Sequence, residues 1–241
     1  MSHLTKLSDT KALNAALAIP ALGVIVDEAP APLAAAALAQ GYRHLVCAPA
    51  HLATVQAAVA AAATPVFITV RLVSPVAPAL AALAQADLLV ATAAADGDLT
   101  ALAQAVAAGR AKAWGSDAED QAAAGQAVLV MPLGVTRQYP AAVARAQAAH
   151  QLVATDLPFG QGDLALLRPL RRMAERYQKT PAQIVVRWLL QGERLVWLPA
   201  QTPAQLAEWG DVFDFELSFH DMQVLASLDG RAMAPQKRRR H

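Results

Sequence analysis

The part of the chain that is most informative about its fold is the stretch Lys179-Thr180-Pro181-Ala182-Gln183-Ile184-Val185-Val186-Arg187-Trp188-Leu189-Leu190-Gln191. It starts as helices start, with Thr180 at the N-cap, a proline at the first helical position and Gln183 at the third. The Thr hydroxyl and the Gln amide can then bind free backbone N–H groups reciprocally. Thr202-Pro203-Ala204-Gln205 repeats the pattern, and Ser218 starts a last helix in the same way.

Along the whole chain, short apolar runs alternate with alanine-rich helical segments. Most runs are continuously apolar, which is typical of parallel strands that are covered on both faces. We expect strands at Leu22–Val26, His44–Ala48, Val66–Leu72, Asp87–Ala91, Lys112–Gly115, Val128–Leu133, Leu152–Thr155 and Leu195–Leu198. Helices are expected between them at Leu33–Gln40, Leu99–Ala108, Ala141–His150 and Leu164–Gln178. Eight strand–helix units in one domain predict a (β/α)8 barrel.

Composition limits the organisation and the class of partner. We expect one barrel domain over residues 1–232 and a basic, disordered tail over 233–241, which we interpret as a solubilising terminus rather than a binding patch. A formal charge of +1 gives no general attraction to nucleic acid or membranes. The uncharged run from Leu52 to Val70 is divided by Pro65, so it predicts a helix and a buried strand rather than a membrane span.

Cysteine and histidine usage argues against two further kinds of site. The only cysteine, Cys47, excludes an internal disulfide and fits a reducing cytoplasm; we expect it to be a small buried residue. The six histidines show no metal-binding spacing, so no metal is expected. We therefore expect a cytoplasmic protein without a metal site.

Four segments, in order along the chain, resemble segments of aldo-keto reductases. They are Gly41–His44, Pro158–Gly162, Lys179–Gln191 and Asp211–Met222, which resemble the family's GYRH, SPLGQG, KTPAQ-x-x-x-RW-x-x-Q and FDFxLS-x-x-DM segments. The resemblance implies an α/β fold, a TIM barrel of aldo-keto reductase type with shortened loops. The pattern is most similar to bacterial 2,5-diketo-D-gluconate reductases, which implies an oxidoreductase with NADPH as cofactor.

The residues at the family's catalytic positions differ from the family pattern. The family uses an Asp, a Tyr general acid, a Lys and a His, because the alkoxide formed by hydride addition needs a proton. By resemblance these positions hold Val46, His51, Arg71 and Thr92. Arginine keeps a charge but does not release its proton. The tentative catalytic residues are therefore His51 and Arg71, and none of the tyrosines, Tyr42, Tyr139 and Tyr177, follows the second strand.

The cofactor positions are changed as well. By resemblance, Ser116, Asp117, Asp156, Gly160 and Gln161 are what remains of the cofactor site. The loop that grips the 2′-phosphate in the family has Ala200, Gln205 and Trp209 in place of Lys, Arg and Asn. Without these ionic partners we expect NADPH binding to be weak or absent.

Three functions are compatible with these residues. We favour a catalytically degenerate family member, a pseudoenzyme retained as a binding or regulatory scaffold. The alternatives are an NAD(P)H-dependent oxidoreductase that reduces small carbonyl compounds with an altered site, and a true reductase aligned differently. His51 and Arg71 are either an anion site or two solvated residues. Because Asp156 is expected across the barrel from Arg71, we expect a cavity of positive character for a small anionic or carbonyl ligand, with no nucleic acid or membrane partner.

Overall fold

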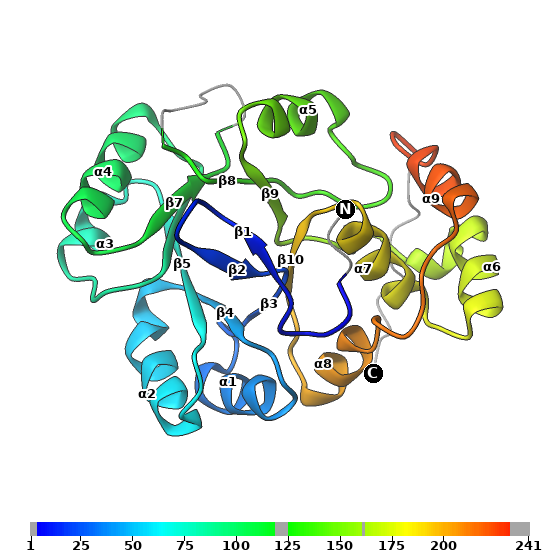
Figure 1. Ribbon diagram of the computed structural model, residues 1–241, viewed down its shortest axis with the longest axis horizontal. Helices are drawn as coiled ribbons and strands as arrows, with labels where there is room; N and C mark the ends of the chain where they lie inside the picture. Colours follow the sequence, from blue (N-terminus) through cyan, green and yellow to red (C-terminus); the bar gives the residue numbers. More distant parts are fainter. Residues whose placement is uncertain (1–3, 119–124, 161, 232–241) are drawn as a thin grey trace.

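The fold was analysed in a computed structural model, which describes residues 4–118, 125–160 and 162–231. Gln161 and the basic tail 233–241 lie outside the described residues. Eight parallel strands close into a barrel (Figure 1), in the order β10-β3-β4-β5-β6-β7-β8-β9. Their bounds are β3 Leu22–Ile25, β4 His44–Cys47, β5 Phe67–Val73, β6 Leu88–Thr92, β7 Ala113–Ser116, β8 Val128–Val130, β9 Leu152–Thr155 and β10 Leu195–Leu198.

The eight predicted strands are all confirmed, and the barrel with them. The one clear difference in bounds is β8, which ends at Val130, whereas the apolar run predicts a strand to Leu133. Pro132 lies in this run, and a proline has no N–H group for the ladder of a central strand. The chain therefore leaves the sheet before Pro132.

Helices surround the barrel. They are α1 Pro30–Ala39, α2 Leu52–Ala62, α3 Ala77–Ala81, α4 Asp96–Ala107, α5 Pro140–Ala148, α6 Arg168–Tyr177, α7 Pro181–Gln191, α8 Pro203–Gly210 and α9 Phe219–Ala226, with 3-10 turns η1 Pro49–His51 and η2 Leu164–Leu166. The predicted helix Leu164–Gln178 is divided at Leu167, because Pro169 allows α6 to start only at Arg168. Among the described residues, no helix combines the length and apolar character needed to cross a membrane.

The predicted helix starts are confirmed. The Thr180 hydroxyl accepts from the Gln183 N–H at 3.3 Å, and the Gln183 side chain accepts from the Thr180 N–H at 2.8 Å. Thr202 and Gln205 form the same reciprocal pair. Helix capping alone explains why these residues occur here, so they are no evidence for a ligand site.

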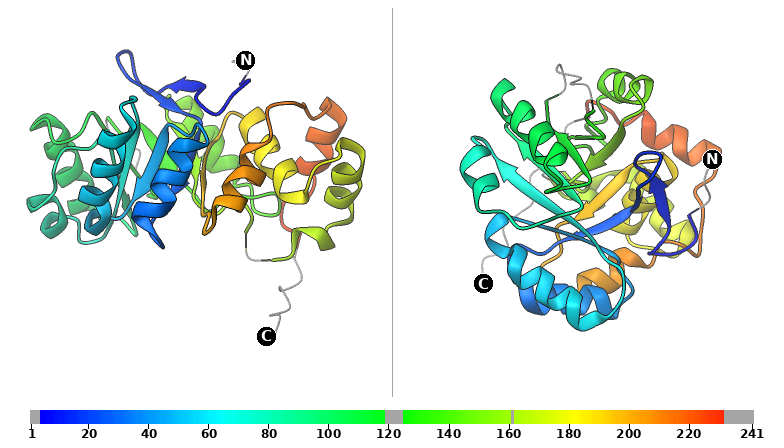
Figure 2. Two further views of the ribbon diagram at one scale, coloured as in Figure 1. Left: turned by 90° about the horizontal axis from the view of Figure 1, so that it is seen from below. Right: turned by 60° about the vertical axis from the view of Figure 1, so that its left-hand side comes forward.

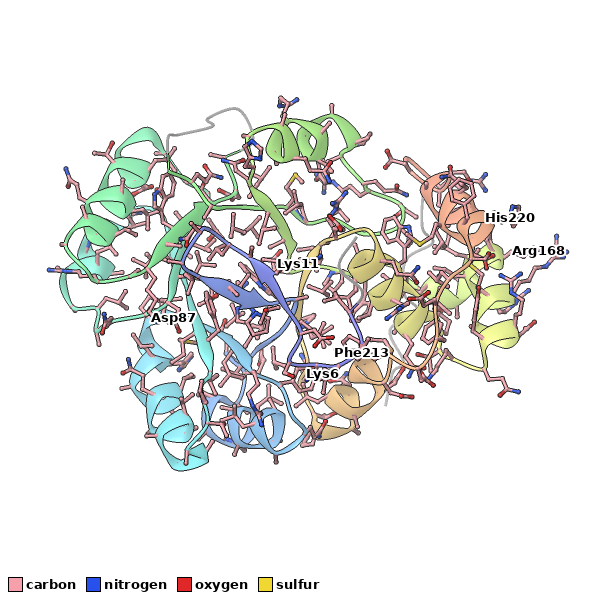
Figure 3. The ribbon with its side chains drawn as sticks, viewed as in Figure 1. Lys6, Lys11, Asp87, Arg168, Phe213 and His220 are labelled. Atoms are coloured by element: carbon pink, nitrogen blue, oxygen red, sulfur yellow. The ribbon has the colours of Figure 1, made fainter. Side chains whose placement is uncertain are left out.

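A hairpin that the sequence analysis does not anticipate closes one end of the barrel. Its strands β1 (Thr10–Ala12) and β2 (Ala18–Pro20) are antiparallel and directly precede β3, so the hairpin lies at the N-terminal ends of the barrel strands. Figure 2 shows it projecting at this end, and Figure 3 shows Lys11 on it, in front of the barrel. Ile19 is fully buried, and the Lys11 side chain is mostly buried. The opposite end, where the strands finish, is left uncovered by the hairpin.

A layer of side chains fills the barrel just inside the hairpin. We call this layer, made of His44, Phe67, Thr69 and Trp197, the floor. Its centre is His44, which is fully buried and packs edge-on against Phe67 and Trp197. Its Nδ1 lies 3.2 Å from the Pro20 carbonyl oxygen and its Nε2 lies 2.8 Å from the Thr69 hydroxyl. A carbonyl only accepts, so Nδ1 carries the proton and Thr69 donates to Nε2. Burial lowers the pKa of His44 to about 4, so the ring is neutral near neutral pH.

Candidate functional site

A cavity of about 530 Å³ lies at the C-terminal ends of the strands, the end of a (β/α)8 barrel where active sites are found. We call it the mouth cavity. Its lining comes from residues at or just after the ends of β3, β5, β8, β9 and β10, namely Ile25, Asp27, Glu28, Arg71, Pro132, Asp156, Leu157, Pro199, Ala200 and Gln201. Loops that follow four strands therefore converge on one cavity with Arg71 of β5.

Arg71 lies at the centre of the polar groups of the mouth. Its Nη2 is 2.7 Å from Oδ2 of Asp27, and its Nη1 is 3.2 Å from Oδ2 of Asp156. The side chains of Arg71, Asp27 and Asp156 are 24%, 25% and 25% exposed. Alternate residues of a strand face the same side, so Arg71 follows Thr69 of the floor layer on the inner face of β5. Nε of Arg71 is buried and has no partner among the described residues.

Asp27 is the site residue that the sequence analysis missed. Its Oδ2 binds Arg71, and its Oδ1 accepts from the Ala48 N–H at 2.6 Å. The carboxylate therefore ties the end of β3 to the loop after β4. A signal was present in the sequence, because Asp27 directly follows a predicted strand and lies two residues after Ile25, on the same face.

The structure corrects the expectation that Asp156 lies too far across the barrel to neutralise Arg71, because the two side chains form an ion pair. They belong to the third and seventh strands of the barrel order, counted from β3. The interior of an eight-stranded barrel is only wide enough for side chains, so a long arginine can span it. The expected positive character is also wrong. One guanidinium faces the three acidic side chains Asp27, Glu28 and Asp156 around the cavity.

His51 does not join Arg71 at this cavity. It is the last residue of η1, the 3-10 turn that starts at Pro49 and leads into α2, and it is partly exposed. It is not among the residues that line the mouth cavity. The tight turn after β4 leaves His51 outside the lining of the mouth cavity, so the expected His51–Arg71 pair is not formed in one pocket.

The residues expected to remain from a cofactor site are divided by the structure. Ser116 is fully buried, with its Oγ 3.3 Å from Oε1 of Gln126. Asp117 accepts from the N–H groups of Ala93 and Ala94 at 2.6 and 3.1 Å, which holds the turn after β6. Both side chains therefore support the fold, and neither lines the mouth cavity.

Asp156 and Gly160 do lie at the mouth. Gly160 adopts a positive φ of 65° and lines a cavity of about 250 Å³ beside the mouth cavity. The two cavities share Pro132 and Leu157. Gln161, the last of the expected residues, is outside the described part of the chain.

Comparison with known proteins shows which sequences resemble parts of this chain. No protein-family profile matches the chain. An aldo-keto reductase of Mycolicibacterium smegmatis is 40% identical over 82 residues, which cover 34% of this chain and 30% of that protein. Methylglyoxal reductase DkgA of Escherichia coli K12 is 38% identical over 81 residues, 32% of this chain and 30% of the enzyme. The matched stretches thus span less than a third of these relatives.

Solved structures agree in fold. A crystal structure of an aldo/keto reductase from Brucella melitensis superposes with a TM-score of 0.80 at 22% identity, over 92% of this chain and 100% of that one. A Bombyx mori aldo-keto reductase in complex with NADP superposes with a TM-score of 0.79 at 18% identity, over 92% and 93%. About a third of the chain is thus similar in sequence to aldo-keto reductases. Its barrel is that of its structural neighbours.

The three tyrosines of this chain lie away from the mouth cavity. The Tyr42 hydroxyl is buried and donates to the Leu206 carbonyl at 2.8 Å, and burial raises its pKa. The Tyr177 hydroxyl donates to Asp221 at 2.6 Å. Tyr139 is the N-cap residue of α5, with the Arg137 guanidinium over its ring. None of the three lines the mouth cavity.

The positions compared with the family's 2′-phosphate loop hold no cation. Ala200 is 2% exposed. The Gln205 side chain accepts from the N–H groups of Gln201 and Thr202 at 2.7 and 3.1 Å, so its oxygen is occupied by the helix cap. The Trp209 ring packs against Phe159 with centroids 4.6 Å apart. These three side chains offer no ionic partner to a phosphate.

Two other kinds of chemistry, a reactive cysteine and a bound metal ion, are not supported by the described residues. Cys47 is fully buried, and burial, with a smaller contribution from Asp27, raises its thiol pKa to about 12. A thiol with this pKa is protonated near neutral pH and is a poor nucleophile. Within the described residues, no group of three or more His, Cys, Asp or Glu side chains could hold a metal ion.

Proposed function

We propose that this aldo-keto reductase family member is catalytically degenerate and acts as a small-molecule binding scaffold, not as a carbonyl reductase. One observation carries the proposal: Arg71, held between Asp27 and Asp156 at 2.7 and 3.2 Å, lines the mouth cavity, and no described residue of this lining is a tyrosine or histidine that could serve as general acid. The arginine does not release its proton, and the tyrosine hydroxyls lie elsewhere. Val46, at the position compared with the family's Asp, cannot transfer a proton either.

The residues of the chain fit an NADPH cofactor poorly. The Bombyx mori relative was solved with NADP, and the family resemblance implies the same cofactor here. However, three acidic side chains surround the mouth cavity, and Ala200 and Gln205 give no cation for a 2′-phosphate. Each lost charged hydrogen bond weakens binding by roughly 1.5–3 kcal/mol. We therefore propose that NADPH binds weakly or not at all, with no preference over NADH.

The charge balance also selects between the two expected ligand classes. A small anionic ligand would face more carboxylates than guanidinium groups, which disfavours it. A small carbonyl compound has no such penalty, and its oxygen could accept from a guanidinium N–H that is not engaged by Asp27 or Asp156. We propose a neutral carbonyl or similarly polar ligand at the mouth, and a cytoplasmic location consistent with the single buried thiol of Cys47.

Two experiments test the proposal. The first measures the binding of NADPH and of NADH by calorimetric titration, and the second measures NADPH-dependent turnover of methylglyoxal. We expect both dissociation constants to be no tighter than about millimolar and NADPH oxidation to stay at background. Low-micromolar NADPH affinity with turnover would overturn it. If that turnover were lost in His51→Ala, the alternative of an altered reductase would hold, with the imidazole as acid. If turnover survived in His51→Ala, the proton would come from another donor.

A further inference from the structure

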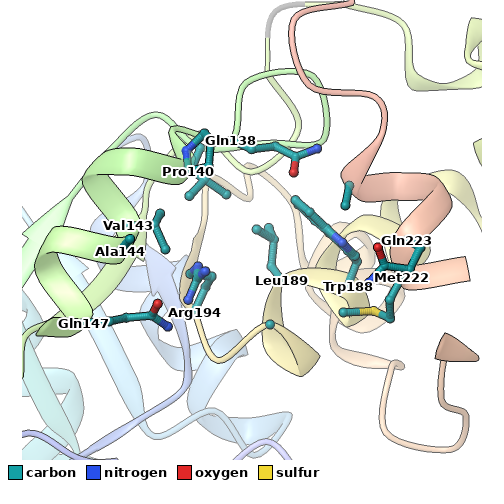
Figure 4. A pocket seen from close by; sticks show the side chains of 13 residues that line it. Gln138, Pro140, Val143, Ala144, Gln147, Trp188, Leu189, Arg194, Met222 and Gln223 are labelled. Carbon is teal, nitrogen blue, oxygen red and sulfur yellow. The ribbon is translucent and has the colours of Figure 1, made fainter. Parts of the chain in front are cut away.

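A second cavity, of about 320 Å³, lies outside the barrel between helices α5, α7 and α9. Helix α5 lines it with Pro140, Val143, Ala144 and Gln147, whose spacing of three and four residues places them on one helix face. Figure 4 shows Val143 and Arg194 on one side of this cavity, with Trp188 and Met222 on the other. We call it the helix cavity, and it shares no lining residue with the mouth cavity.

Hydrogen bonds at its rim fix the shape of the helix cavity. The side-chain amide of Gln138 donates to the Val135 carbonyl at 2.7 Å and to the Leu225 carbonyl at 2.9 Å. The backbone N–H of Gln138 donates to Asp229 at 2.8 Å. These bonds join the segment that enters α5 to the end of α9. The cavity is thus a preformed space between helices.

Arg194 is the charged residue of the helix cavity, and it has no partner among the described residues. It directly precedes β10, and its side chain makes no hydrogen bond or ion pair with any of the residues that the structure describes. Burial lowers its pKa, and the neighbouring Glu193 opposes this only by its field. A cation removed from water without a partner is costly, so this position favours binding of an anion.

A second cation adds to the positive field at this end of the helix cavity. Lys11 of the hairpin is mostly buried, and burial lowers its pKa; attraction to Glu193 opposes this, and repulsion from Arg194 lowers the pKa further as the smallest cause. Because each charge affects the other, the two cations lie near each other. Glu193 is exposed, so water screens its opposing charge.

The other residues that line the helix cavity indicate the size and polarity of the part of the ligand that does not contact Arg194. Trp188, Leu189, Val143 and Met222 give the cavity apolar sides. One guanidinium has the planar fork that matches a carboxylate, and a single cation suits a monoanion better than a phosphate dianion. We propose that the helix cavity binds a small monocarboxylate with an apolar body, its carboxylate on Arg194 and its body against Trp188 and Leu189. This site is separate from the mouth, and its existence does not depend on the function proposed there.

Calorimetric titration of the full chain with phenylacetate, and with the uncharged phenylacetamide as its matched counterpart, tests the site. We expect phenylacetate to bind and phenylacetamide to bind at least roughly tenfold more weakly, because only the acid offers a charged acceptor. Arg194→Gln should weaken phenylacetate binding roughly tenfold to hundredfold. Arg172→Gln, the same change at an exposed arginine of α6, should leave it unchanged. Equal binding of acid and amide, or no effect of Arg194→Gln, would overturn the proposal.

Two further measurements separate a ligand site from a structural arginine. Ala144→Phe fills the helix cavity from an exposed position of α5 and should abolish binding while Arg194 is intact. Without ligand, the thermal midpoint of Arg194→Gln should equal or exceed that of the wild type, because the arginine loses no partner in the part of the chain that the structure describes. Phenylacetate should raise the midpoint of the wild type only. A marked loss of stability in Arg194→Gln, or full binding by Ala144→Phe, would contradict the assignment.

Discussion

Polar side chains lie at both ends of the barrel interior, and their surroundings differ. At the floor, His44 is fully buried and both ring nitrogens have partners, the Pro20 carbonyl and the Thr69 hydroxyl. At the mouth, Arg71 is 24% exposed, pairs with Asp27 and Asp156, and adjoins a cavity of about 530 Å³. Thr69 and Arg71 are two residues apart on one strand. A polar residue inside this barrel therefore supports the fold where the hairpin excludes water, and borders a cavity at the end that the hairpin leaves uncovered.

The strongest test of this difference is the pH dependence of the floor. The pKa of His44 is lowered to about 4 by burial, while the unfolded chain has an ordinary value of about 6.5. As pH falls from about 6.5 to 4, the unfolded state takes up a proton that the native state does not. The free energy of unfolding should therefore fall by about 3 kcal/mol across this window. Urea unfolding measured from pH 7.5 to 4 checks this.

Two variants attribute the effect to His44. In His44→Gln the amide can still donate to Pro20 and accept from Thr69, but it does not titrate, so the loss between pH 6.5 and 4 should shrink. His220→Gln, at an exposed position of α9, should keep it. The lowered pKa of Asp98 and of Asp214 affects stability below this window. An unchanged slope in His44→Gln would contradict the neutral buried ring.

A smaller effect is expected from crowding the floor. A Cβ atom added at Gly23 would lie 2.8 Å from Nδ1 of His44, which is too close for either group to stay in place. Gly23→Ala should therefore lower the free energy of unfolding by about 2 kcal/mol, measured in urea. Gly97→Ala is the control, since nothing lies within 4 Å of its added Cβ, and it should be neutral or slightly stabilising. Equal effects of the two substitutions would mean that the floor is loosely packed.

The smallest effect is expected at the mouth. Because Arg71 and its two partners are each about a quarter exposed, Arg71→Met should change the free energy of unfolding by less than about 1 kcal/mol. Added salt should reduce the difference further, since screening weakens ion pairs that water reaches. Urea unfolding at low and high salt measures both. A loss as large as that at the floor would remove the distinction between the two ends.

The strands were predictable because their signal is local. The runs Leu152–Thr155 and Leu195–Leu198 are strands in the structure with the predicted bounds. The hairpin was missed because Thr10–Ala12 and Ala18–Pro20 are three residues each, too short to show a pattern.

The arrangement at the mouth was less predictable, because it depends on distances across the barrel. A resemblance assigned Arg71 to the mouth, where the structure has it. Its pairing with Asp156 joins residues 85 positions apart in sequence, from strands that are not neighbours. His51 was misplaced because the turn from Pro49 determines its direction. Sequence patterns indicate which strand end carries a residue, but not which side chains meet.

The pairing of β10 with β3 has a consequence for the growing chain. The first barrel strand, Leu22–Ile25, remains unpaired on one side until the last strand, Leu195–Leu198, has been synthesised. Until then β9 also has a free edge, because β10 inserts between the two. Unpaired strand edges are templates for association with other chains. A nascent or truncated chain that stops before Leu198 therefore exposes two strand edges with which other chains can pair.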